Sequence, residues 1–225
     1  MTAEYKAGRF GNGPIVETVR NVLAIPLGVY RFEITGQEHL AGIRNHPSVV
    51  AFFPHTSHLD PISIRKGTPG DLRKFEVFPA AADRWYSNSV NAVFSSLMLI
   101  TIPLDRIEAK ESVIRCRQVL DHGFTLVFSP EGTRTRKPLE ERDLKRGPAD
   151  LALRGGYPII PVRLRGFENI MPKGHLPRLF DGTQRYRVSL SFGKPICVPQ
   201  IEDVVQRKQE SLALTEHLKQ RFLEM

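Results

Sequence analysis

The chain has 225 residues, of which 41% are hydrophobic and 25% are charged, and its formal net charge is +8 with an isoelectric point of about 9.7. This composition is typical of a globular protein and excludes a repeat or low-complexity protein. The positive charge suits nucleic acid, an anionic membrane leaflet or a phosphorylated substrate, and it does not choose among them.

The cysteines and the uncharged stretches indicate the kind of cellular compartment and whether a membrane span is expected. Cys116 and Cys197 have no zinc-site spacing and suggest no disulfide framework, so a reducing compartment is expected. Residues 1–14 lack the apolar core of a signal peptide. The longest uncharged run, residues 87–104, is rich in Ser and Asn in its first half and predicts a helix followed by a strand. We therefore expect no transmembrane helix.

The N-terminal segment, residues 1–30, contains apolar positions at roughly helical spacing from residue 13 onward, interrupted by Pro26. This pattern predicts an amphipathic helix. Two interpretations stay open: the helix packs its apolar face on the core, or it lies on a membrane surface.

Strands and helices then alternate to the end of the chain, and no linker separates residues 31–225. Strands are predicted at 31–35, 49–53, 75–80, 100–104, 125–129, 157–166 and 187–193. Helices are predicted at 61–65, 85–97, 107–121, 147–156 and 200–224. This alternation predicts a single α/β domain with a mostly parallel central sheet flanked by helices.

The heptapeptide PHTSHLD, residues 54–60, follows the buried strand predicted at 49–53. In a continuous helix, His55 and Asp60 would lie about 140° apart around the axis. A turn between strand and helix can instead bring the Asp60 carboxylate to Nδ1–H of His55 and leave Nε2 free as a base. Asp60 also suits the N-terminus of a helix.

Three other interpretations of this turn stay open. Asp60 could be only a helix cap and His55 only a turn residue. A metal site could use His55, His58 and Asp60, although no H-E-x-x-H motif is present and no second cluster supplies a fourth ligand. A serine hydrolase would need Ser57 or Ser129 as nucleophile, and neither lies in a G-x-S-x-G motif.

A second polar stretch, SPEGTRTRKP at residues 129–138, follows the strand predicted at 125–129. Gly132 allows close approach of the backbone, and Glu131 can orient an arginine or bind a substrate hydroxyl. Thr133 offers a hydroxyl and Arg134 a guanidinium group. A guanidinium group can bind two phosphate oxygens at once through two parallel hydrogen bonds. The alternative is an exposed basic loop without a ligand.

The two stretches are expected to share one site, because ligands of open α/β sheets bind beyond the carboxyl ends of the strands. Arg106 follows the strand predicted at 100–104 and falls at the same edge. Lys145 lies just before a predicted helix N-terminus, where anions are favoured.

These motifs resemble the conserved blocks of the glycerolipid acyltransferases, and 1-acylglycerol-3-phosphate acyltransferase is the most similar class. The resemblance extends over residues 33–195, although Pro54, Ile100 and Ser129 depart from the residues common in the family. Five segments carry the resemblance. His55–Asp60 matches the H-x4-D motif, and Asp105–Arg106 matches the end of the second block, which is an arginine. Pro130–Arg134 matches the P-E-G-T-R motif, Leu144–Gly147 resembles the F-K-x-G segment, and Ile160–Val162 resembles the block with a V-P-x core.

The resemblance implies a reaction and roles for residues. His55 is expected to act as general base and Asp60 to orient its imidazole, while an acyl group passes from acyl-CoA or acyl-carrier protein to the hydroxyl of a lysophosphatidic-acid-like acceptor, giving phosphatidic acid. No metal or bound cofactor is implied. The residues implied for the acceptor phosphate are Arg106, Glu131, Gly132, Thr133, Arg134 and Lys145, and those implied for the acyl side are Pro161 and Val162.

The resemblance also implies a cytoplasmic protein that lies peripherally on the inner face of the cell membrane and contacts membrane lipids. Two alternatives stay open: the same chemistry on another acceptor, such as an ornithine lipid, a glycolipid or a specialised metabolite, and a non-enzymatic basic module that binds lipid. Few aromatic residues interleave the basic runs, so nucleic acid is not expected as a partner.

Overall fold

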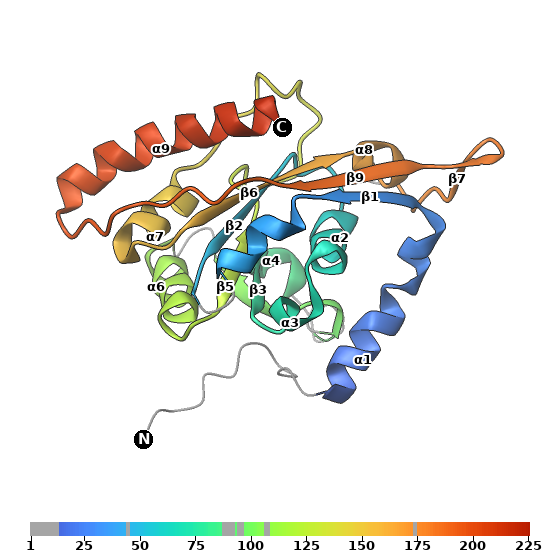
Figure 1. Ribbon diagram of the computed structural model, residues 1–225, viewed down its shortest axis with the longest axis horizontal. Coiled ribbons are helices and arrows are strands. Elements are labelled where there is room, and N and C mark those ends of the chain that lie inside the picture. Colours follow the sequence, from blue (N-terminus) through green and yellow to red (C-terminus); the bar gives the residue numbers. More distant parts are fainter. Residues whose placement is uncertain (1–13, 44–45, 87–92, 94–96, 106–108, 173–174) are drawn as a thin grey trace.

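A central sheet organises the protein (Figure 1). The computed structural model describes residues 14–225 except 44–45, 87–92, 94–96, 106–108 and 173–174. Within those residues, seven strands form this sheet in the order β1-β9-β6-β2-β5-β3-β4, and β7 and β8 form a separate hairpin. The strands are β1 Arg31–Thr35, β2 Val49–Phe53, β3 Glu76–Ala81, β4 Thr101–Leu104, β5 Thr125–Phe128, β6 Ile159–Arg165, β7 Phe180–Asp181, β8 Gln184–Arg185 and β9 Arg187–Phe192.

The sheet is mostly parallel, which confirms the predicted fold class. Neighbouring strands of the described sheet pair in parallel, except that β6 pairs with β9 in antiparallel register. The central strand β2 is buried along its whole length, as expected for a strand covered on both faces.

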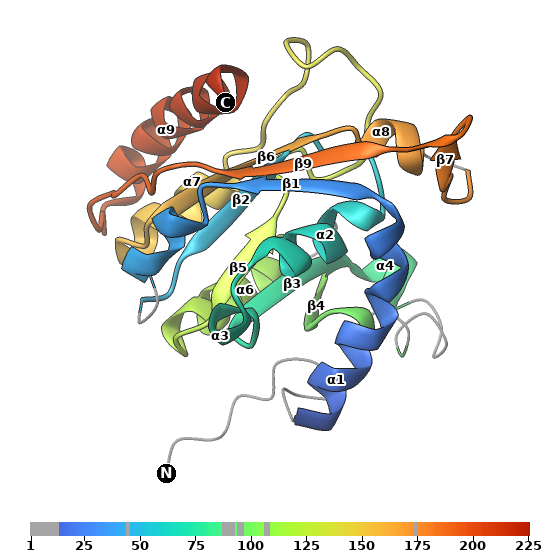
Figure 2. The ribbon, with the colours of Figure 1, turned by 45° about the vertical axis from the view of Figure 1, so that its right-hand side comes forward.

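Helices cover both faces of the sheet (Figures 1 and 2). Alternate residues of β2 pack into two separate clusters: Val50 and Phe52 meet η1, η2, α2 and α3, whereas Val49, Ala51 and Phe53 meet α6, α7 and α9. The helices are α1 Pro14–Leu23, η1 Ile25–Val29, η2 Gln37–Ile43, α2 Leu59–Gly67, α3 Gly70–Arg73, α4 Ala82–Trp85, α6 Ala109–Asp121, α7 Gly147–Gly155, α8 Phe167–Ile170 and α9 Val204–Glu224.

The predicted elements are found with three differences. The N-terminal helix is divided into α1 and the short 3-10 helix η1. Most of the helix predicted at 85–97 lies outside the described residues. The β7–β8 hairpin and the short helices η2, α3, α4 and α8 were not predicted. In the described ranges, every helix is too short or too polar to cross a bilayer.

A buried carboxyl group lies at the start of β3. Glu76 Oε1 accepts a hydrogen bond of 2.7 Å from Thr68 Oγ1, and Arg65 Nη1 lies 3.8 Å from Oε2. Burial raises the pKa of Glu76 from 4.5 to about 7, although the Thr68 hydrogen bond and the Arg65 charge both lower it. The folded protein therefore holds this proton more tightly than the unfolded chain does.

This raised pKa predicts a pH-dependent stability. The contribution of Glu76 is fully present below pH 4.5 and is lost as the pH rises through about 7. We expect Glu76→Gln to stabilise the protein at pH 8 by roughly 3 kcal/mol at most, and to change its stability little at pH 4.5. Urea unfolding of both proteins at the two pH values measures this.

Glu33→Gln is the matched control, because Glu33 lies exposed on β1. It should leave the difference between the two pH values as in the wild type. An equal effect of Glu76→Gln at both pH values would contradict the assignment of a raised pKa.

Candidate active site

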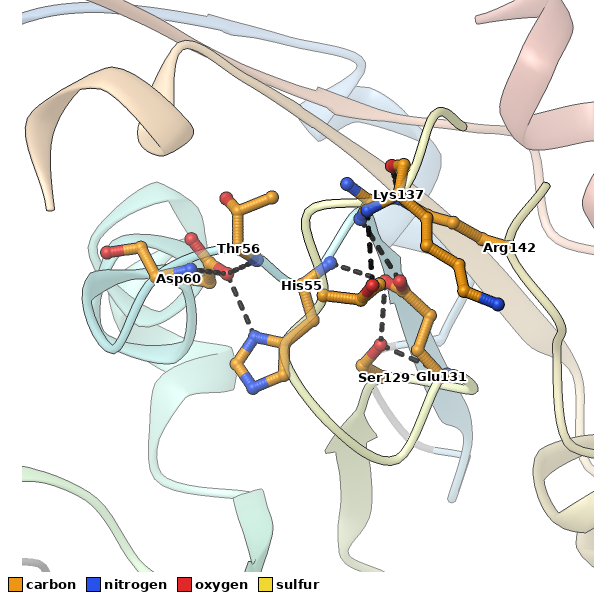
Figure 3. Close-up of polar contacts among 9 residues, drawn as sticks. His55, Thr56, Asp60, Ser129, Glu131, Lys137 and Arg142 are labelled. Atoms are coloured by element: carbon orange, nitrogen blue, oxygen red, sulfur yellow. Dashed lines mark hydrogen bonds and ion pairs between the residues drawn. The ribbon is translucent and has the colours of Figure 1, made fainter. Parts of the chain in front are cut away.

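His55 lies in the turn between β2 and α2, and Asp60 lies in the first turn of α2, where the sequence pattern placed them. The chain leaves β2 at Phe53, and α2 begins at Leu59, so Asp60 falls in the first turn of that helix. His55 Nδ1 lies 2.9 Å from Asp60 Oδ2 (Figure 3). The turn thus brings together two side chains that a continuous helix would separate.

The Asp60 carboxylate is held by more than the imidazole. Its Oδ2 also accepts hydrogen bonds from the backbone N–H groups of Thr56, at 2.8 Å, and Ser57, at 2.9 Å. Asp60 is fully buried. Three donors therefore fix one oxygen beside the imidazole, and this fixes the ring that it faces.

The hydrogen bond sets the tautomer of His55. A carboxylate only accepts hydrogen bonds, so Nδ1 carries the proton and Nε2 presents its lone pair. Nε2 points away from Asp60 (Figure 3), and no described residue makes a hydrogen bond to it. The side chain of His55 is 20% exposed, which leaves it accessible to a substrate. This geometry suits a general base.

The second motif holds the backbone of His55 from both sides. The backbone N–H of His55 donates to Glu131 Oε2 at 2.5 Å, and the carbonyl oxygen of His55 accepts from the N–H of Thr135 at 3.3 Å. The two segments meet because β2 and β5 are parallel neighbours, with Ala51 opposite Phe128. The two motifs therefore form one site, as the sequence predicted.

Both carboxylate oxygens of Glu131 are bound within the protein. Oε1 lies 3.1 Å from Arg142 Nη1, and Oε2 accepts from the backbone of His55. The backbone N–H of Glu131 donates to Ser129 Oγ at 3.2 Å. Burial raises the pKa of Glu131, although the His55 N–H and the charge of Arg142 lower it. Glu131 therefore joins the backbone of His55 to Arg142, and its role in binding the acceptor stays a prediction.

The ion pair between Glu131 and Arg142 predicts a coupled effect on stability. Both side chains are almost completely buried. Arg142→Met leaves a buried carboxylate without its cation, and we expect it to lower the free energy of unfolding by about 3 kcal/mol. The double variant Glu131→Gln/Arg142→Met should regain much of this loss. Urea unfolding is measured for the wild type, Arg142→Met, Glu131→Gln and the double variant; strictly additive effects would show that the two residues are not coupled.

Gly132 of the P-E-G-T-R segment lies against the side chain of Lys145. Gly132 has φ +67°, and a Cβ atom built there would lie 3.0 Å from Lys145 Nζ. A side chain at this position would therefore be strained and would displace the lysine. Gly132, Thr133 and Lys145 are exposed, whereas Arg134 is 9% exposed.

The residues predicted for the acyl side lie within a strand and not beyond its end. Pro161 and Val162 lie inside β6, opposite Ala51 and Phe52 of β2, and both are buried. Their assignment to the acyl side stays a prediction. Arg106 lies outside the described residues.

Two buried arginines were not predicted as site residues from the sequence. The guanidinium carbons of Arg142 and Arg163 lie 5.8 and 5.3 Å from the centroid of the Phe53 ring. Burial lowers the pKa of Arg163, and the nearby charge of Arg165 lowers it further. The sequence pattern could have indicated Arg163, because it interrupts an apolar strand. A charged residue inside a central strand is buried only if its charge has a partner. The pattern gave no such indication for Arg142, since it lies in a long polar stretch.

The structure gives positions for the residues of the alternative sites. His58 packs edge-on against Trp85, with ring centroids 5.2 Å apart. Ser57 and Ser129 are buried, and the Oγ atom of each accepts a backbone N–H. In the described part of the chain, no group of three or more His, Cys, Asp or Glu side chains has a metal-binding arrangement.

Comparisons with known proteins agree with the motifs. Residues 31–165, more than half of the chain, match the protein family described as Acyltransferase. The chain resembles 1-acyl-sn-glycerol-3-phosphate acyltransferase BAT2 of Brassica napus, with 34% identity over 80 residues, and LPAT1 of Arabidopsis thaliana, with 34% identity over 91 residues; both are named as chloroplastic. These matches cover 34% and 39% of this chain but only 23% and 25% of the relatives.

A solved structure has a similar fold. It is the 1-acyl-sn-glycerophosphate (LPA) acyltransferase PlsC from Thermotoga maritima, with a TM-score of 0.61 and 16% sequence identity. The similarity covers 92% of this chain and 79% of that protein. At this level of identity, the comparison supports the arrangement of strands and helices alone.

Proposed function

We propose that this chain, which belongs to the acyltransferase family, transfers a fatty acyl group from an acyl thioester to the free hydroxyl of lysophosphatidic acid. The observation that supports this most is the contact of 2.9 Å between His55 Nδ1 and Asp60 Oδ2, in a turn that the P-E-G-T-R segment binds through Glu131. An oriented base beside a basic segment fits the acylation of a phosphorylated alcohol.

In the proposed reaction, His55 Nε2 takes the proton of the acceptor hydroxyl as its oxygen attacks the thioester carbonyl carbon. Asp60 stabilises the imidazolium that forms. The tetrahedral intermediate then collapses, the carbon–sulfur bond breaks, and the imidazolium returns its proton to the departing thiolate. General-base catalysis of this kind contributes about 10²–10⁴-fold, and positioning of the two substrates contributes much of the rest.

The acceptor phosphate is assigned to the basic segment around Gly132. Thr133 and Lys145 are exposed there, and Arg134 supplies a guanidinium group for paired hydrogen bonds with phosphate oxygens. The names of the plant relatives, which specify a 1-acyl-sn-glycerol-3-phosphate acceptor, agree with this chemistry. Phosphatidic acid is then the product.

The acyl donor is an acyl thioester, either acyl-CoA or acyl-carrier protein. The proposed reaction needs no bound cofactor, because the thioester itself supplies the activated acyl group. We also propose that the protein works at a membrane surface on the cytoplasmic side, since the acceptor and the product are lipids. α1 exposes Ile15, Val19 and Val22, which suit such a surface.

Acceptor specificity tests the phosphate assignment. Thiol release from palmitoyl-CoA is measured with lysophosphatidic acid and with monoacylglycerol, which lacks the phosphate. We expect Arg134→Gln to raise the KM for lysophosphatidic acid by about 10–100-fold, because a charge-assisted hydrogen bond is lost. The same change should affect monoacylglycerol little.

Arg117→Gln provides a matched loss of one guanidinium group on α6 and should behave as the wild type. The phosphate assignment is wrong if Arg134→Gln keeps the wild-type KM and kcat for lysophosphatidic acid. It is also wrong if both acceptors lose activity equally.

A further inference from the structure

The topology places four chain segments at one edge of the sheet. β6 runs antiparallel to β9, with Arg165 opposite Ser189, and β9 runs parallel to β1. The starts of β1 and β9 therefore lie at the edge where β2 and β6 end. His55 follows β2 at this edge. α1 and η1, which precede β1, and the β7–β8 hairpin, which precedes β9, lie there too (Figures 1 and 2).

Exposed apolar side chains are concentrated in two of these segments. The segment at residues 175–187, here called the hairpin segment, exposes Leu176 at 84%, Leu179 at 45% and Phe180 at 53%. α1 exposes Ile15, Val19 and Val22. The hairpin extends beyond the body of the molecule in both views (Figures 1 and 2), so these side chains contribute little to the core.

The hairpin segment is also basic. Arg178, Arg185 and Arg187 are exposed, against a single acidic residue, Asp181. Two further exposed arginines lie beside it. Arg31 of β1 pairs with Arg187, and Arg165 is the last residue of β6. The exposed acidic residue Glu168 follows in α8. Apolar side chains bordered by arginines complement an anionic bilayer, where the guanidinium groups meet lipid phosphates and the apolar groups enter the acyl region.

We propose that the hairpin segment is a second membrane-docking element, which inserts Leu176, Leu179 and Phe180 into an anionic bilayer. Together with α1, it turns the His55 edge of the sheet toward the lipid. This inference deepens the proposed function and rests on it, because the acceptor and the product are taken to be membrane lipids. The hairpin's two-residue strands pair with each other outside the main sheet, so docking gives the exposed apolar side chains of the segment a partner.

Vesicle binding tests the hairpin segment directly. Cosedimentation is measured with vesicles of phosphatidylglycerol and phosphatidylcholine in equal parts. We expect Leu176→Ser/Phe180→Ser to weaken binding by about tenfold or more, because two apolar side chains no longer leave water. The control Val205→Ser/Leu212→Ser removes two exposed apolar groups from α9, and its binding should stay at the wild-type level.

Charge gives a second arm of the test. Arg178→Gln/Arg185→Gln should weaken binding to the mixed vesicles and leave binding to pure phosphatidylcholine vesicles unchanged. Wild-type binding by both the serine and the glutamine hairpin variants would overturn the inference, and would leave α1 or a protein partner for the hairpin as alternatives.

Activity measurements separate this inference from the proposed function. With a short-chain lysophosphatidic acid that stays monomeric, the hairpin variants should retain wild-type acyl transfer; with acceptor embedded in vesicles, they should lose it. If the wild type transfers no acyl group, the proposed function fails while vesicle binding still decides the role of the hairpin. Thermal unfolding shows whether each variant is folded. If Leu176→Ser/Phe180→Ser is unfolded, the single variant Leu176→Ser takes its place in these measurements.

Discussion

His55→Ala should lower kcat for acyl transfer by about 10²–10⁴-fold without unfolding the protein. The reason is that no other described side chain shares the position of Nε2, which carries the proton in the proposed reaction. The expected size follows from general-base catalysis, which typically supplies about 10²–10⁴-fold. The His55 side chain is partly exposed, and its backbone contacts with Glu131 and Thr135 survive the change.

The measurement is thiol release from palmitoyl-CoA with lysophosphatidic acid, together with thermal unfolding of each protein. His217→Ala serves as the matched control, because it removes an exposed imidazole from α9. Turnover by His55→Ala within tenfold of the wild type would rule out His55 as the base.

Asp60→Asn should have a comparable effect on kcat for a different reason. The same Oδ2 atom accepts from His55 Nδ1–H and from the backbone N–H groups of Thr56 and Ser57, so the Asn oxygen takes its place and keeps these hydrogen bonds. The neutral amide, however, no longer supplies the negative charge that stabilises the imidazolium formed in the proposed reaction. The corresponding change from Asp to Asn in a Ser-His-Asp triad lowers kcat by about 10⁴-fold.

Asp60→Ala separates orientation from folding. It leaves two buried N–H groups without an acceptor, and each unsatisfied group costs about 1–3 kcal/mol. We therefore expect Asp60→Ala to lose activity and stability together, and Asp60→Asn to lose activity mainly. Measurements of kcat and of urea unfolding distinguish the two. An Asp60→Asn protein with wild-type kcat would show that the negative charge of Asp60 does not contribute to catalysis.

The position of the site could be predicted from the sequence because it depends on local patterns and one topological rule. PHTSHLD and SPEGTRTRKP each follow an apolar strand, and parallel neighbours end at the same edge of the sheet. The His55–Asp60 contact spans five residues, so the turn alone accounts for it. The fold class followed from the alternation of strands and helices in the same way.

The contacts of Glu131 could not be predicted, because they join residues far apart in the chain. The bond between the His55 N–H and Glu131 spans 76 residues, and the Arg142 partner comes from a stretch without regular periodicity. The hairpin segment was missed because its strands have two residues each, too few to show an alternating pattern. Arg106 lies outside the described residues, and its place at the site stays a prediction.

The proposed function requires that an acyl group passes from a thioester to a lysophosphatidic acid hydroxyl. The most direct measurement incubates the wild-type protein with palmitoyl-CoA, with and without lysophosphatidic acid, and identifies the lipid product by mass spectrometry. We expect thiol release to require the acceptor, and one phosphatidic acid to form for each thiol released. Thiol release without the acceptor, with free palmitate as the product, would contradict the proposed function.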